Sequence, residues 1–195
     1  MKHGEIITGE TSLLDRRASL RKAAIGLGIF LLIFGLIQSL LPLRTAVQIG
    51  ADEGFELAKV TLCAHGHKLY TEIWNDQPPL HTFLITQIIK HVSRSVLGPR
   101  LVTSGFTVVL LISYFFLIRR LTGLGTALVG VALVIASPGF LELSASCMVE
   151  IPGLAIAIAG LCLLANAPPI RWGLGEVLAG VLFGMALQIK LINLI

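Results

Sequence analysis

Three ionisable side chains, far apart in the sequence, lie beside long apolar runs. Asp52, with its neighbour Glu53, follows the first apolar run, Glu150 precedes a later one, and Lys190 lies near the end of the last. A charged group beside a bilayer is costly and usually has a function. A carboxylate within hydrogen-bond reach of a hydroxyl can take its proton. We therefore expect a reaction at the membrane surface, on a molecule that the membrane presents.

Each of these residues also has a purely structural interpretation. An acid stabilises a helix N-terminus by about 0.3–1 kcal/mol, which suits Asp52 at the start of an amphipathic stretch. Glu150 precedes Pro152 in a sequence typical of a helix start. Lys190 could simply extend its ammonium group to the membrane interface. For Asp52 the two roles are compatible, because a carboxylate at a helix start is held rigidly and points out of the bundle.

The composition is that of an integral membrane protein. Hydrophobic residues make up 55% of the 195 residues, charged residues 13%, and the mean hydropathy is +0.87. Soluble domains carry roughly 25% charged residues, so this chain has about half the charge that a soluble protein uses to cover its surface. We therefore predict an all-α, polytopic bundle of transmembrane helices.

Apolar stretches predict about five spans after a basic cytoplasmic tail over residues 1–22. The run at 23–41 is too long for a signal peptide and has no cleavage site after it, so it is read as a retained span. The segment Leu80–Val92 is too short and polar to cross lipid, and we expect an interfacial helix there, begun by Pro78-Pro79. The predicted spans are 23–41, 100–118, 122–138, 150–166 and 173–193, with a first outer loop over 42–99.

The distribution of basic residues predicts a cytoplasmic N-terminus. Clusters before the first span, at Arg119-Arg120 and at Arg171, all fall on one side of the predicted membrane, which the positive-inside rule makes cytoplasmic. The basic residues in the loop 42–99 argue the other way, but a loop approaching about 60 residues has less influence on topology. This topology brings Asp52, Glu150 and Lys190 to the outer leaflet.

Other kinds of site find little support. His65-Gly66-His67 lacks a matching Cys or His pair, so no metal site is predicted, and nothing supports a divalent cation or another cofactor. The odd cysteine count gives no disulfide, although Cys63 and Cys147 are both predicted outside. The cytoplasmic clusters explain the net charge of +4, so no nucleic-acid partner is expected. Gly180-x-x-x-Gly184 fits a small-residue helix contact.

Several motifs together resemble a known family. The chain resembles the N-terminal portion of C-type (GT-C) glycosyltransferases, and is most similar to their protein O-mannosyltransferase and aminoarabinose-transferase branch, which includes lipopolysaccharide-core galacturonosyltransferases. The resemblance covers about residues 20–195. The motifs are Asp52-Glu53-x-Phe55, Gly66-His67-Lys68-Leu69-Tyr70-Thr71-Glu72-Ile73, Asp76-Gln77-Pro78-Pro79-Leu80, Leu97-Gly98-Pro99-Arg100 and Glu150-Ile151-Pro152.

The resemblance implies transfer of a sugar from a polyprenyl-phosphate carrier to a lipid, glycan or protein acceptor. The reaction would take place on the extracytoplasmic face, with a bacterial inner or plasma membrane as the expected location. Asp52 matches the family's general base, Glu53 the second acid of the pair, and Glu150 a later acid.

The carrier phosphate has several candidate partners. Gln77 stands where the family often has a lysine that contacts this phosphate. His81, Arg100 and Lys190 are alternative phosphate-binding residues, and the sequence does not choose among them.

Members of this superfamily are usually longer. We therefore expect the chain to be the N-terminal portion of such an enzyme, and whether it is active by itself is left open. Two other classes of function also remain. One is a transporter, in which Asp52, Glu150 and Lys190 would form a proton or ion relay. The other is a non-catalytic membrane scaffold that packs against partner proteins.

Overall fold

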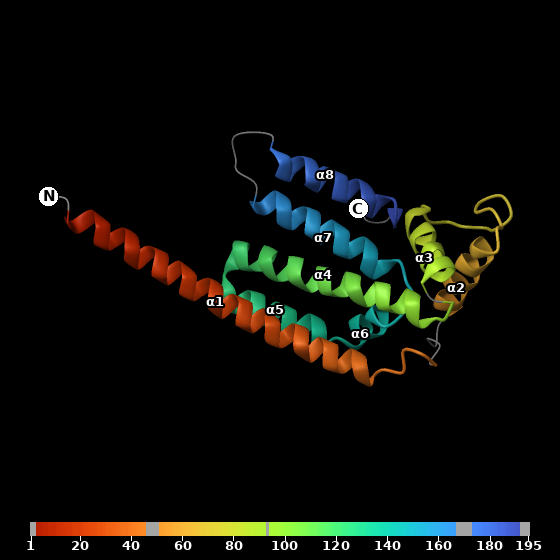
Figure 1. Cartoon of the computed structure of the whole chain (residues 1–195), viewed down its shortest axis with the longest axis horizontal. Helices are drawn as coiled ribbons and strands as arrows, with labels where there is room; N and C mark the ends of the chain where they lie inside the picture. The colour runs from red at the N-terminus through yellow and green to blue at the C-terminus, as the bar shows by residue number, and fades with distance from the viewer. Residues whose placement is uncertain (1–2, 46–50, 93, 167–172, 192–195) are drawn as a thin grey trace.

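The computed structural model describes residues 3–45, 51–92, 94–166 and 173–191, which form eight α-helices (Figure 1). The predicted all-helical membrane bundle is confirmed, and no strand occurs within these residues. In chain order the helices are α1 (His3–Leu40), α2 (Ala51–Ala64), α3 (Leu80–His91), α4 (Leu97–Thr122), α5 (Leu124–Ala136), α6 (Pro138–Ser144), α7 (Glu150–Asn166) and α8 (Leu174–Leu187).

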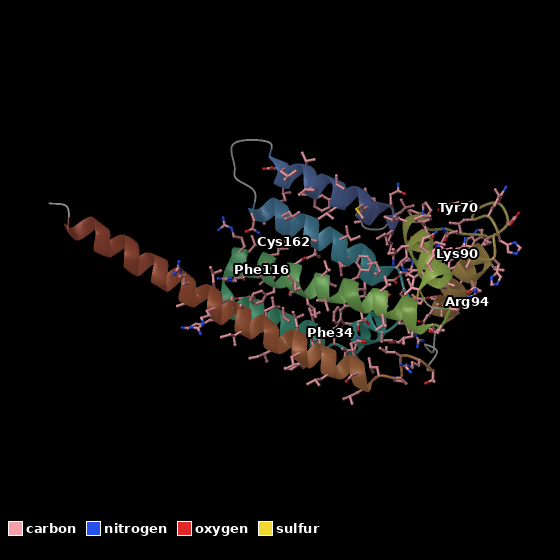
Figure 2. The ribbon with its side chains drawn as sticks, in the orientation of Figure 1. Phe34, Tyr70, Lys90, Arg94, Phe116 and Cys162 are labelled. Carbon is pink, nitrogen blue, oxygen red and sulfur yellow. The ribbon has the colours of Figure 1, made fainter. Side chains whose placement is uncertain are left out.

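Helix α4 lies at the centre of the bundle, between α1 and α5 on one side and α7 on the other, with α8 beyond α7. Phe34, Phe115 and Val131 are buried where α1, α4 and α5 meet. Ile156 and Ala186 are buried between α7 and α8. Figure 2 shows Phe34 and Cys162 along the bundle and Tyr70 at its far end.

Two helices are long and apolar enough to cross a membrane, within the part of the chain that the structure describes. They are Arg17–Leu40 and α4, and a third crossing results if α5 and α6 form one span bent by 74°. The bend follows from Pro138, whose ring disfavours a helical conformation at Ser137. Ser137 accordingly has extended backbone angles, with φ −76° and ψ 119°. Helices α7 and α8 are apolar but shorter, so the prediction of five spans stays a prediction.

Several helices begin or end at other residues than the predicted spans. The helix α1 begins at His3 rather than near residue 23, so it includes most of the predicted tail. The last helix, α8, ends at Leu187, which leaves Lys190 beyond it. The last residues of the predicted fifth span, 192 and 193, lie outside the described residues, as does Arg171.

The contact between α7 and α8 does not use the predicted glycine pair. A Cβ atom built on Gly180 or Gly184 would meet no heavy atom within 4 Å, so these glycines make no close helix contact with the described residues. The close approach occurs instead at Gly160, where a Cβ would lie 3.2 Å from the Phe183 ring. Gly184 lines an open groove between α8 and α3.

Helices α2 and α3 pack against each other at the end of the bundle where α4 begins. Val60 of α2, Ile85 of α3 and Cys147 form a buried cluster between them. Helix α3 occupies the segment in which the sequence predicts an interfacial helix. The loop over 65–79, which connects α2 to α3, completes this end of the molecule and carries part of the candidate site.

Candidate active site

A polar pocket of about 460 Å³ opens at the α2–α3 end of the bundle. Its walls come from four places in the chain: the first turns of α2, the loop before α3, the loop before α7, and the segment after α8. Three of the predicted site residues with ionisable side chains meet here. The lining residues are Asp52, Phe55, Glu56, Trp74, Asp76, Gln77, Met148, Val149, Glu150 and Lys190.

Glu150 and Lys190 form an ion pair at the pocket wall. The Lys190 Nζ donates to Glu150 Oε1 at 2.5 Å, and both side chains are partly exposed. Glu150 is the first residue of α7, while Lys190 follows the end of α8, so the pair connects two helices at this end. The second carboxylate oxygen of Glu150 is buried and has no hydrogen-bond partner among the described residues. It remains available to a ligand.

Asp52 presents a carboxylate to the pocket from the first turn of α2. The residue is exposed, and among the described residues no ion pair or hydrogen bond engages its side chain. The predicted position at a helix start is therefore observed. It gives the carboxylate a fixed attachment and leaves its oxygens free to accept a proton or a hydrogen bond.

Glu53 lies on the other side of the same helix turn, in a buried ion pair with Arg100. The Arg100 Nε and Nη2 atoms donate to the two oxygens of Glu53, each at 2.8 Å. The Glu53 side chain is completely buried, and its Oε1 also accepts from the Cys147 backbone N–H at 2.8 Å. Arg100 Nη1 donates to the Leu43 carbonyl. Neither residue lines the pocket. Their observed contacts connect α2 with α4 and with the loops that carry Leu43 and Cys147.

Helix α2 buries its charged face and exposes its apolar one. Glu56 and Lys59 are almost completely buried, whereas Phe55 and Leu62 are more than 40% exposed. This is the reverse of a helix in a soluble protein, and it suits a helix at a bilayer surface, where lipid can solvate apolar side chains. The buried charges then pair within the protein.

The buried Lys59 connects α2 to the loop that carries part of the pocket. Its Nζ donates to Glu56 Oε1 at 2.7 Å and to Asn75 Oδ1 at 2.8 Å. Asn75 Nδ2 donates in turn to the Gln77 carbonyl, which also accepts from the Tyr70 hydroxyl. These contacts hold the loop over α2 and so position the pocket residues that it carries.

Glu56 has a buried carboxyl that faces both the pocket and His81. Burial raises the pKa of Glu56, but His81 and Lys59 outweigh that effect and hold the pKa below its usual value. The His81 Nδ1 lies 3.8 Å from Glu56 Oε2, which is beyond hydrogen-bond distance. Neither ring nitrogen of His81 has a hydrogen-bond partner among the described residues, and the side chain lies outside the pocket lining.

Gln77 and an aromatic pair form the opposite wall. Gln77 Oε1 is buried without a hydrogen-bond partner among the described residues, and its Nε2 donates to Asp76 at 3.2 Å. The Trp74 and Phe55 rings are 5.9 Å apart between centroids, and Trp74 is 69% exposed. The wall therefore offers both an amide and an aromatic surface.

Six lining residues were not predicted as site residues from the sequence, namely Phe55, Glu56, Trp74, Asp76, Met148 and Val149. Glu56 lies four residues after Asp52, so the two share a helix face, and this spacing was a usable signal. Trp74 and Asp76 belong to the motif around Pro78-Pro79, but nothing in the sequence shows that they face Glu150. Among the described residues, no three His, Cys, Asp or Glu side chains are placed to hold a metal ion.

Cys147 is buried in the cluster with Val60 and Ile85 and is expected to be unreactive. Burial, with the negative charges of Glu56 and Glu53, raises the pKa of its thiol to about 12. The thiolate is the reactive form, so the folded protein should label at Cys147 about tenfold or more slowly at pH 8 than at half-buried Cys63. Maleimide labelling of two variants, each retaining one of these cysteines, measures the rates.

Unfolding in detergent should make the two cysteines equally reactive. Equal rates in the folded protein would contradict the burial of Cys147.

Comparison with known proteins identifies one related family. The family model described as dolichyl-phosphate-mannose-protein mannosyltransferase matches residues 76–194, which is more than half of the chain. No curated protein and no solved structure gave a match. The matched region includes Gln77, Glu150 and Lys190 of the pocket, while Asp52 precedes it.

Proposed function

The chain belongs to the dolichyl-phosphate-mannose-protein mannosyltransferase family of GT-C membrane glycosyltransferases, and from this membership we propose that its polar pocket transfers a sugar from a polyprenyl-phosphate carrier. The observation that carries the proposal is the pocket itself. It has the carboxylate of Asp52, which no described residue pairs with, and the ammonium group of Lys190 around one space. Transfer of a glycosyl group from phosphate to a hydroxyl requires a proton acceptor and a positive charge.

An apolar groove next to the pocket supports an amphiphilic donor. The groove has a volume of about 600 Å³ and is lined by Pro79, Leu80, Phe83, Val181, Gly184, Met185 and Gln188. It uses the segments that follow Gln77 and precede Lys190, and the Leu80 backbone N–H donates to the Gln188 carbonyl between them. A carrier with its phosphate in the pocket would thus have an apolar surface for its chain.

Each side chain then has a role in the reaction. The Asp52 carboxylate accepts the proton of the acceptor hydroxyl while the hydroxyl oxygen bonds to the sugar carbon. The bond from that carbon to the phosphate oxygen breaks, and the polyprenyl phosphate leaves with the electron pair. Lys190, positioned by Glu150, stabilises the phosphate charge.

Among the residues considered for the carrier phosphate, Lys190 has the best geometry. Arg100 is committed to Glu53 and the Leu43 carbonyl, and His81 is 1% exposed. Gln77 lines the pocket and can donate through its amide. The exposed Trp74, paired with Phe55, offers a flat apolar surface for a sugar ring.

We place the reaction on the extracytoplasmic face, since the positive-inside rule puts the other end of the bundle in the cytoplasm. Arg119-Arg120 lie at the end of α4 remote from the pocket. The acceptor is a hydroxyl of a lipid, glycan or protein.

A transfer assay tests the proposal. The purified chain in liposomes is given radiolabelled polyprenyl-phosphate hexoses and pentoses, with a detergent extract of membranes as the source of acceptors. We expect label to move from the carrier to a product in the presence of the chain. Failure with every carrier, from protein shown to be folded, would contradict the proposal.

A further inference from the structure

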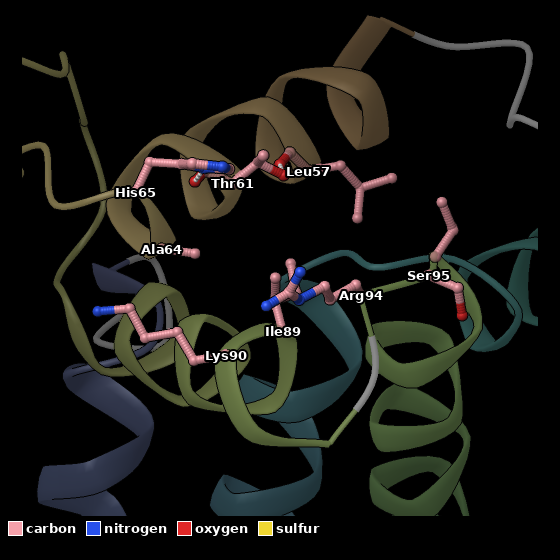
Figure 3. Close-up of a pocket in the computed structure, with 9 residues that line it drawn as sticks. Leu57, Thr61, Ala64, His65, Ile89, Lys90, Arg94 and Ser95 are labelled. Carbon is pink, nitrogen blue, oxygen red and sulfur yellow. Dashed lines mark hydrogen bonds between the residues drawn. The ribbon is translucent and has the colours of Figure 1, made fainter.

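A second pocket, of about 360 Å³, lies between α2 and α3 on a different face from the candidate active site. Its lining residues are Leu57, Thr61, Ala64, His65, Ile89, Lys90, Arg94, Ser95 and Val96. The two pockets have no lining residue in common. Figure 3 shows Thr61 and His65 of α2 on one side, Lys90 of α3 on the other, and the Arg94 side chain extending between the helices.

The pocket has basic side chains and no acidic one in its lining. Lys90 and Arg94 have no ion pair or hydrogen bond from their side chains to any other described residue, so no described acid neutralises their charges. The His65 Nδ1 lies 2.8 Å from the Thr61 carbonyl oxygen. Because that oxygen can only accept, the proton of the neutral ring is on Nδ1. This N–H is already used by the Thr61 carbonyl, so His65 contributes little to binding an anion.

The position of this pocket relative to the membrane indicates which kind of anion would fit it. Ser95 and Val96 immediately precede α4, one of the two helices long enough to span a bilayer. The pocket therefore lies at the level of a membrane interface. Leu57, Ile89 and Val96 give its wall an apolar part, and Leu62 of α2 is exposed nearby. An amphiphile with an anionic head would match both parts.

We propose that this pocket binds the phosphate of a lipid headgroup. The Lys90 ammonium and the Arg94 guanidinium contact the phosphate oxygens, and the apolar wall contacts the start of the acyl chains. The site is separate from the pocket assigned to sugar transfer and does not depend on that assignment. It would hold α2 and α3 at the membrane surface through a bound lipid.

Lipid binding to the purified full chain tests the proposal. Native mass spectrometry would give the Kd for phosphatidylglycerol, with phosphatidylcholine of the same acyl chains as the zwitterionic control and inorganic phosphate as the competing free anion. Wild-type protein should prefer phosphatidylglycerol. The double variant Lys90→Gln/Arg94→Gln should bind it about 30-fold more weakly, the loss expected for two cations near an anionic surface.

Two further variants separate the pocket from general effects. Lys90→Arg/Arg94→Lys retains both charges and should keep the affinity within about threefold. Lys68→Gln removes a charge from the exposed loop and should leave the affinity unchanged.

Three results would overturn the proposal. The first is wild-type affinity in the double glutamine variant, and the second is equal binding of phosphatidylcholine. The third is displacement of phosphatidylglycerol by micromolar inorganic phosphate, which would identify a free anion rather than a lipid headgroup.

Discussion

Replacing Asp52 with asparagine is expected to reduce sugar transfer by about 10²–10⁴-fold while leaving the protein folded and inserted. Such losses are typical when a general base is removed, and the asparagine amide cannot take a proton from the acceptor. No hydrogen bond or ion pair joins its side chain to another described residue, so the change should have little effect on the fold. Initial rates with a radiolabelled lipid-linked sugar measure the loss, and the melting temperature of the same preparation checks the fold.

A matched control for Asp52 is Glu72→Gln. Glu72 is an exposed acid in the loop over 65–79, where it contacts His67 and the Lys68 backbone N–H, and it does not line the pocket. Its variant should transfer sugar within about twofold of wild type. If Asp52→Asn retained wild-type turnover, or fell no further than Glu72→Gln, Asp52 would have no part in the chemistry.

The Arg100→Gln variant is expected to be the most destabilising single change considered. It leaves the completely buried Glu53 carboxylate without its two charged hydrogen bonds. Breaking a buried ion pair by removing one partner typically costs about 3–5 kcal/mol, which for a chain of this length is a melting temperature lower by about 10 °C. Thermal unfolding in detergent, followed by thiol-reactive dye, gives the shift.

Removing both charges should restore much of the stability. In Glu53→Gln/Arg100→Gln neither of these two positions carries a buried charge, and the glutamine oxygen at position 53 can still accept from the Cys147 N–H. Arg120→Gln, an exposed arginine at the other end of α4, serves as the control and should melt within about 2 °C of wild type. An Arg100→Gln melting temperature within that same interval would show that the pair is not needed for stability.

Composition alone was enough to predict the fold class, because 55% hydrophobic residues leave too few charges to cover a soluble protein. Helix limits were less predictable. Pro138, the last residue of the third predicted span, ends α5 because its ring disfavours a helical Ser137, yet Pro152 sits inside the first turn of α7 without breaking it. The effect of a proline depends on where the helix begins.

The site was partly predictable from helix starts. Asp52 and Glu150 precede helical sequences, and the structure has both in first turns that face one pocket. The pairing of Glu53 with Arg100, 47 residues away, could not be read from one sequence, because spacing along the chain carries no information about contacts between helices. The burial of Lys59 could not be predicted either, because the charged face of an amphipathic helix is normally assigned to solvent.

Photo-crosslinking of the carrier tests the central claim most directly, namely that the pocket of Asp52, Glu150 and Lys190 holds a lipid-linked sugar. A polyprenyl-phosphate sugar with a diazirine on the sugar would be irradiated with the full chain, and the modified peptides mapped by mass spectrometry. We predict labels on the segments 74–77 and 148–150, lost when unlabelled carrier is in excess. Labels that lie only elsewhere on the chain, or that persist against excess carrier, would contradict it.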